Sequence, residues 1–128
     1  PVPRPFHRLM EFEPLARLSD IPEGGMLAVR KRTGEPLCLF RLDGRVGAVL
    51  DRCTHADFAM SDGELHPRSE IECVWHGARF NCWTGRVTKG PADEPLPVFD
   101  VKVEGEMVLV GRQRAPGSPP AAPHGATT

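Results

Sequence analysis

Two short segments, each pairing a cysteine with a histidine, constrain the fold of this 128-residue chain more than any other feature. The segment CTHADF separates Cys53 from His55 by one residue, and CVWHG separates Cys73 from His76 by two. Each segment offers one thiolate and one imidazole, which are both ligands of transition metals. If the four side chains bind one metal centre, the fold must hold the two segments side by side.

The hydrophobic pattern is typical of an all-β domain. Short runs rich in Val, Leu and Phe alternate with glycine-containing turns such as Asp43-Gly44, and no stretch has a helical period long enough for a core helix. Residues 11–20 are expected to contain one helical turn. The predicted strands cover 26–31, 36–42, 45–51, 70–75, 79–83, 99–105 and 106–112. Both Cys/His pairs then fall where a strand ends and a loop begins, a common place for functional residues.

Length and composition predict one domain between two tails. We assign 1–13 to an N-terminal extension, 14–111 to the domain, and 112–128, which is rich in Pro and Ala, to a flexible tail. The formal charge of -1 argues against nucleic acid and anionic membranes as partners. The chain shows no apolar run of about 18 residues and no secretory signal, which predicts a cytoplasmic location.

The four cysteines could form two disulfides, but thiols close to histidines in a reducing cytosol more often bind a metal. Cys38 and Cys82 lie outside the two pairs and are expected to be buried free thiols. The other histidines, His7, His66 and His124, are scattered through a tail, a turn and another tail, so they offer no facial triad for a mononuclear iron.

A zinc finger usually places both cysteines in one knuckle and both histidines on a helix, whereas here each segment is mixed. The remaining interpretation is an iron–sulfur cluster of the [2Fe-2S] type, in which two cysteines bind one iron and two histidines bind the other.

The two halves of the pattern and their spacing resemble a known motif. The sequence C-T-H at 53–55, 17 intervening residues, and C-V-W-H at 73–76 followed by glycine resemble the cluster-binding motif of Rieske [2Fe-2S] proteins. The similarity extends over residues 14–111. It implies a Rieske fold, an antiparallel β-sandwich in which two loops form a small cluster-binding subdomain at about residues 51–90. The ligands that it implies for one cluster are Cys53, His55, Cys73 and His76, with the histidines on the exposed outer iron.

The resemblance also implies a low reduction potential. Rieske proteins of quinol-oxidising complexes carry a further cysteine in each loop, and the two form a disulfide; no such cysteine occurs here. They also have a serine and a tyrosine whose hydroxyl groups donate hydrogen bonds to sulfur. This chain has Ala78 and Phe80 at the matching positions. Because hydrogen bonds to sulfur stabilise the reduced cluster, losing them lowers the potential. We expect a value near the lower end of the Rieske range, about -150 mV.

The segment CTHADFAMSDGEL resembles the first loop of the ferredoxins that serve ring-hydroxylating dioxygenases. This implies an electron carrier, not an enzyme, that passes single electrons from an NAD(P)H-dependent flavoprotein reductase to a terminal Rieske non-heme iron oxygenase. The chain has no G-x-G-x-x-G fingerprint for binding NADH itself. A monomer is expected for such a shuttle. The alternatives are a small Rieske-like subunit of a nitrite reductase and a zinc-stabilised interaction module.

Several residues near the motif have two interpretations. Trp75 and Trp83 could shield a cluster or mark a docking face, but packing in the core is the more frequent role of tryptophan. Residues 89–97 resemble the proline-containing loop that covers the cluster in the family, with Pro91 as the expected contact. The docking face is expected around the two ligand histidines, with contributions from Phe58 and Trp75. Between residues 51 and 90 there are six acidic and five basic residues, which is too balanced to predict the charge of a partner's surface.

Overall fold

The computed structural model describes residues 12–54, 57–75 and 77–115, and within them the regular structure consists of strands and short 3-10 turns. Two antiparallel sheets account for the strands, which confirms the all-β prediction. The large sheet has the order β1-β10-β9-β4-β3-β2 and contains β1 (Glu13–Arg17), β2 (Met26–Arg30), β3 (Pro36–Leu42), β4 (Arg45–Leu50), β9 (Val98–Glu104) and β10 (Met107–Gln113). The small sheet has the order β5-β6-β7-β8 and contains β5 (Glu64–His66), β6 (Glu70–Glu72), β7 (Arg79–Asn81) and β8 (Val87–Lys89).

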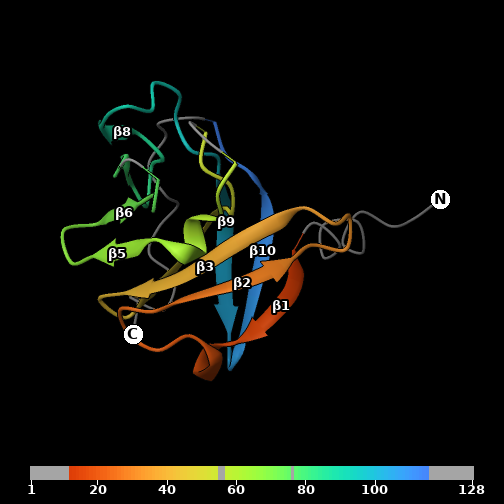
Figure 1. Cartoon of the computed structure of the whole chain (residues 1–128). Coiled ribbons are helices and arrows are strands. Elements are labelled where there is room, and N and C mark those ends of the chain that lie inside the picture. Colours follow the sequence, from red (N-terminus) through yellow and green to blue (C-terminus); the bar gives the residue numbers. More distant parts are fainter. Residues whose placement is uncertain (1–11, 55–56, 76, 116–128) are drawn as a thin grey trace.

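The small sheet is an insertion between two strands of the large one. Figure 1 shows the long strands β3, β9 and β10 forming the body of the molecule, with β5, β6 and β8 grouped beside one end of it. Because β4 and β9 pair with each other, the segment between them leaves the large sheet and returns to it. The sequence between these two strands therefore forms a subdomain of its own, as the resemblance implied.

Strand β3 explains how the two sheets are joined, because it is buried on both faces. Leu37 and Leu39 pack in one hydrophobic cluster within the large sheet. Cys38 and Phe40 point the other way, into a cluster that also contains Phe80 of the small sheet. A strand covered on both sides needs apolar residues at successive positions, which is why PLCLFRL reads as a nearly continuous apolar run.

All seven predicted strands occur, and β1, β5 and β8 were missed. The three missed strands are short and rich in polar residues, so their pairing partners rather than their own sequence determine them. The helical turn expected in 11–20 is present as the 3-10 turn η1 (Leu18–Asp20), but the residues before it form β1. Strand β6 ends at Glu72 rather than at residue 75, so that a loop begins at Cys73.

The predicted turn between β3 and β4 is confirmed. Asp43 and Gly44 both have positive φ, 56° and 76°, as a tight two-residue hairpin turn requires. The Glu23 carboxylate accepts hydrogen bonds from both turn amides, at 2.6 Å from Asp43 N and 2.9 Å from Gly44 N.

The large sheet includes residues near both ends of the described part of the chain. Strand β1 starts at Glu13, β10 ends at Gln113, and Arg114 N still donates a hydrogen bond to Val98 O at 2.8 Å. The rest of the two predicted tails, residues 1–11 and 116–128, lies outside the described residues. Within the described part of the chain, no helix is long and apolar enough to cross a membrane.

Candidate metal centre

Two loops begin at Cys53 and Cys73, and each is closed by the same kind of backbone hydrogen bond. We call residues 53–58 the first ligand loop and residues 73–78 the second. In each loop the cysteine amide donates a hydrogen bond to the carbonyl oxygen five residues later, Cys53 N to Phe58 O and Cys73 N to Ala78 O, both at 2.8 Å. In the second loop Gly77 has a φ of 71°, a conformation that glycine adopts without steric cost. The two predicted histidine ligands, His55 and His76, lie outside the described residues.

The structure brings the two predicted cysteine ligands together. Cys53 and Cys73 are 3% and 0% exposed and belong to the same core cluster. The pKa of the Cys73 thiol is raised to about 11, mainly by burial; the Trp75 amide lowers this pKa and the hydrogen bond with the Cys53 thiol raises it. That amide is 3.4 Å from Cys73 Sγ and donates to it. Two adjacent buried thiols are difficult to ionise without a compensating cation, and a metal ion supplies one.

Cys38 and Cys82 are the buried free thiols that were predicted, at 0% and 1% exposed. Burial raises the pKa of both, that of Cys82 to about 12. All four cysteines are free, so no disulfide joins any of them.

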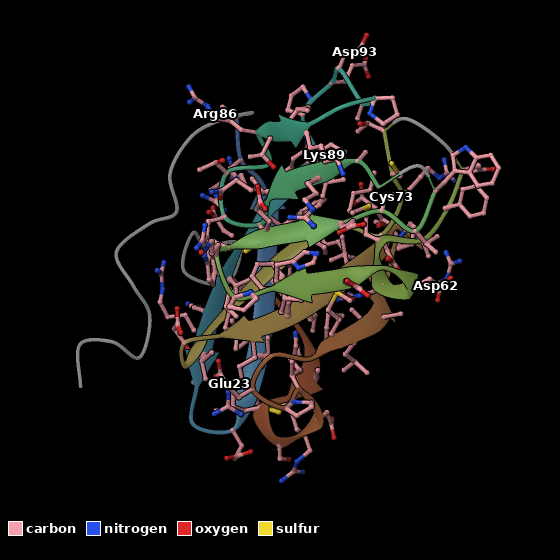
Figure 2. All side chains as sticks on the ribbon, turned by 60° about the vertical axis from the view of Figure 1, so that its left-hand side comes forward. Glu23, Asp62, Cys73, Arg86, Lys89 and Asp93 are labelled. Carbon is pink, nitrogen blue, oxygen red and sulfur yellow. The ribbon has the colours of Figure 1, made fainter. Side chains whose placement is uncertain are left out.

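A third segment borders the ligand loops. Thr54 in the first ligand loop donates through Oγ1 to Glu94 O at 2.8 Å, which fastens the 89–97 segment to that loop. Figure 2 shows Cys73 at the end of the molecule opposite Glu23, with Asp62 and Asp93 on the same side as Cys73. A contact between Pro91 and a cluster stays a prediction.

The two tryptophans have different environments. Trp83 is half-buried and packs against the core cluster, with its ring centroid 4.8 Å from that of Phe40 and with the Arg45 guanidinium over its face. Core packing is thus confirmed for Trp83. It is wrong for Trp75, which is 45% exposed and stacks on Phe58, itself 38% exposed. The predicted strand 70–75 included Trp75, so its side chain was expected to point to one face of the sheet. Trp75 instead lies in the turn after β6.

The outer face of the small sheet holds a second group of potential metal ligands that the sequence did not predict. Strand pairing places Glu64 opposite Glu72, and Glu72 opposite Arg79. His66, which was predicted to lie in a turn, is the last residue of β5, and its Nε2 is 2.7 Å from Glu72 Oε1 and 3.6 Å from Glu64 Oε1. In ELH and EIE the polar residues flank one apolar residue. This alternation is typical of a strand and could have predicted that the polar side chains share one face of a sheet.

This second group is an ion-pair network rather than a vacant cation site. Arg79 Nε lies 3.0 Å from the same Oε1 atom of Glu72 that His66 contacts, and Arg79 NH1 lies 3.2 Å from Glu70 Oε1. The hydrogen bond from His66 is the main reason that the pKa of Glu72 is lowered, and Arg79 lowers it further. The oxygen that would bind a metal is therefore already neutralised by Arg79.

Comparisons with known proteins identify the family of the chain. The family model of the Rieske [2Fe-2S] domain matches residues 11–100. The ferredoxin component of the naphthalene 1,2-dioxygenase system of Pseudomonas aeruginosa is 40% identical over 73% of this chain and 88% of its own length. The biphenyl dioxygenase ferredoxin subunit of Pseudomonas sp. (strain KKS102) is 33% identical over 83% of this chain and 96% of its own length.

Among solved structures, the fold is similar to a chain from the complex of reduced oxygenase and oxidized ferredoxin in carbazole 1,9a-dioxygenase. The TM-score is 0.76 at 31% identity, and the match covers 82% of this chain and 97% of that one.

The chain belongs to the Rieske [2Fe-2S] domain family, and its cofactor is one Rieske-type [2Fe-2S] cluster. Its relatives are ferredoxin components of dioxygenase systems, which confirms the prediction of an electron carrier rather than a catalytic enzyme. The donor set of the described residues fits the cysteine half of such a cluster, because two thiols lie side by side, buried, with a backbone N–H donating to one sulfur.

Proposed function

We propose that the protein carries single electrons from an NAD(P)H-dependent flavoprotein reductase to a terminal Rieske non-heme iron oxygenase, as a cytoplasmic monomer. The observation that carries this proposal is the pair of buried thiols at the start of two matched loops, in a chain whose relatives are named as dioxygenase ferredoxin components. A Rieske cluster supplies reversible uptake of one electron.

The proposed ligands are Cys53 and Cys73 for one iron and His55 and His76 for the other. Both cysteines are buried, which supports placing the iron that they would hold toward the core. The histidine iron then lies toward the exposed side chains of the loops. An electron would enter and leave on that side.

We propose a low potential for the bound cluster. Ala78 and Phe80 are both fully buried and carry no hydroxyl group, so neither side chain can donate a hydrogen bond to sulfur. The donor that the described residues do provide is the Trp75 amide. Since fewer donors leave the added negative charge less stabilised, this arrangement supports a potential near the lower end of the Rieske range, about -150 mV.

The proposed docking face is the surface of the two ligand loops. Large apolar side chains are exposed there: Phe58, Val74 and Trp75. The exposed charged side chains next to the ligand loops and in the 89–97 segment are mostly acidic: Asp57, Asp62, Asp93 and Glu94, against Arg52 and Lys89. We call this group of charges the acidic rim; within it, Arg52 pairs with Asp57 at 3.2 Å. The balanced count between 51 and 90 missed the excess because Asp93 and Glu94 lie beyond residue 90. A partner with a basic rim around an apolar recess fits this surface.

A reconstituted electron-transfer chain tests the proposal. The reductase and oxygenase components of the naphthalene 1,2-dioxygenase system would be supplied with NADH and naphthalene, with this protein in place of that system's ferredoxin. We expect product formation that requires this protein and becomes slower as salt is added, because salt screens the acidic rim. Reduction of the protein by the reductase without any delivery to the oxygenase, or no reduction at all, would contradict the proposed role.

A further inference from the structure

The two ligand loops are joined directly by a pair of aromatic rings. Phe58 is the last residue of the first ligand loop and Trp75 lies in the second. Their rings are nearly parallel, with an interplanar angle of 15° and a centroid separation of 5.1 Å. Stacked rings attract each other beyond the area that they bury. The pair therefore holds together two loops that come from different parts of the sequence.

Each ring is also connected to a ligand cysteine through its own backbone. Phe58 O accepts the hydrogen bond from Cys53 N, and Trp75 N donates the one to Cys73 Sγ. The stack thus completes a series of noncovalent contacts that runs from Cys53 through Phe58 and Trp75 to Cys73. No covalent bond follows this path, because all four cysteines are free.

We propose that the Phe58–Trp75 stack braces the two ligand loops and positions the Trp75 amide on Cys73 Sγ. The inference rests on the cluster ligands proposed above. Trp75 is then a positioning residue whose ring fixes the direction of its own N–H group. Without the stack, Trp75 loses a contact that fixes its orientation, and the hydrogen bond from its amide to Cys73 Sγ weakens.

The brace has two consequences for a bound cluster. Reduction adds negative charge, which spreads onto the ligand sulfurs, so an amide held on Cys73 Sγ stabilises the reduced state. Loops that are held together also release iron more slowly, because both cysteines must move apart before the cluster leaves. A side-chain pair that served only to contact a partner would affect neither property.

The test needs only the purified holoprotein. The variants are Trp75→Ala, Phe58→Ala, the double variant, and Trp75→Phe, which keeps a stacking ring. The matched control is Val74→Ala, since Val74 lies in the same loop and is 58% exposed. Protein-film voltammetry gives the midpoint potential, and the bleaching of the visible spectrum with an iron chelator gives the rate of cluster loss.

We expect each alanine variant to lower the equilibrium constant for reduction by up to about tenfold, which is 59 mV for a one-electron couple. We expect several-fold faster loss of the cluster from the same variants. The double variant should be no worse than either single one, because both changes remove the same interaction. Trp75→Phe and Val74→Ala should keep the midpoint potential and the rate of cluster loss of the wild type.

Three results would overturn the brace: a wild-type potential and release rate in either alanine variant, an equal shift in Val74→Ala, or a failure of Trp75→Phe to keep the potential. Because the two rings are partly exposed, their truncation leaves the core clusters intact, and circular dichroism of each variant verifies this. If the wild-type protein itself carries no [2Fe-2S] cluster, the proposed function fails before any variant is compared.

Discussion

Cys53 and Cys73 open the two ligand loops, whereas Cys38 and Cys82 lie deeper, on β3 and just after β7, in the same core cluster. All four are buried and free, and burial raises the pKa of Cys38, Cys73 and Cys82. What differs is the backbone around them. The first pair occupies matched loops with a thiol–thiol contact and an amide on sulfur, and each member has a histidine two or three residues later.

The comparison shows that burial alone does not identify a metal ligand. Cys38 alternates with the apolar residues of a strand and makes a long contact of 3.8 Å from its Sγ to Leu39 O. A thiol in that setting behaves as a small hydrophobic side chain. A ligand needs a loop that can present several donors to one point, which is what residues 53–58 and 73–78 provide.

The largest effect is expected for the loop pair. Replacing Cys73 by alanine removes one of the two thiolates that we propose for the same iron, so the purified variant should contain almost no iron or acid-labile sulfide. Iron and sulfide assays measure this directly. A full cluster content in Cys73→Ala would remove Cys73 from the ligand set.

The matched change in the core should leave the cluster in place. Cys38→Ala deletes a buried sulfur from a strand and should reduce the free energy of unfolding by about 1 kcal/mol. Urea unfolding gives the stability, and the iron assay gives the cluster content. If this variant loses its cluster as Cys73→Ala does, the distinction between the two pairs is wrong.

A smaller effect is expected from adding a donor to the second ligand loop. Ala78→Ser introduces a hydroxyl group next to the cluster site, and a hydrogen bond to sulfur should raise the midpoint potential by roughly 20–60 mV. Voltammetry measures the shift. Ala48→Ser is the control, because Ala48 is also buried but lies on β4 in the other hydrophobic cluster. An equal rise in both, or no rise in Ala78→Ser, would contradict the hydrogen-bond explanation.

The smallest effect concerns acid stability on the small sheet. The pKa of Glu72 is lowered in the folded protein by His66 and Arg79, so Glu72 stabilises the fold above its ordinary pKa of 4.5. That contribution is lost as the pH falls through the lowered value. The melting temperature should therefore drop below about pH 4.5, and drop less in Glu72→Gln. Glu64→Gln is the control, and an equal change in both variants would rule out the specific role of Glu72.

The sequence predicted the all-β fold, and it singled out the two loop cysteines that the structure brings together, because both depend on local signals. Alternating apolar runs and glycine turns identified seven strands, and the mixed Cys/His spacing identified the loops that hold Cys53 and Cys73. The environment of Trp75 depended on where β6 ends, which pairing with β7 decides. The His66 hydrogen bond and the Arg79 ion pairs depend on register between strands, and the acidic rim depends on the fold bringing the 89–97 segment next to the first ligand loop. None of these three can be obtained from spacing along the chain.

The central claim is that the loops around Cys53 and Cys73 hold a Rieske cluster. The most direct measurement is the metal content of anaerobically purified protein, together with its electron paramagnetic resonance spectrum after reduction by dithionite. We predict two irons per chain and the signal of a reduced [2Fe-2S] centre with mixed cysteine and histidine ligands. A protein that contains zinc, no iron and no such signal would contradict the account.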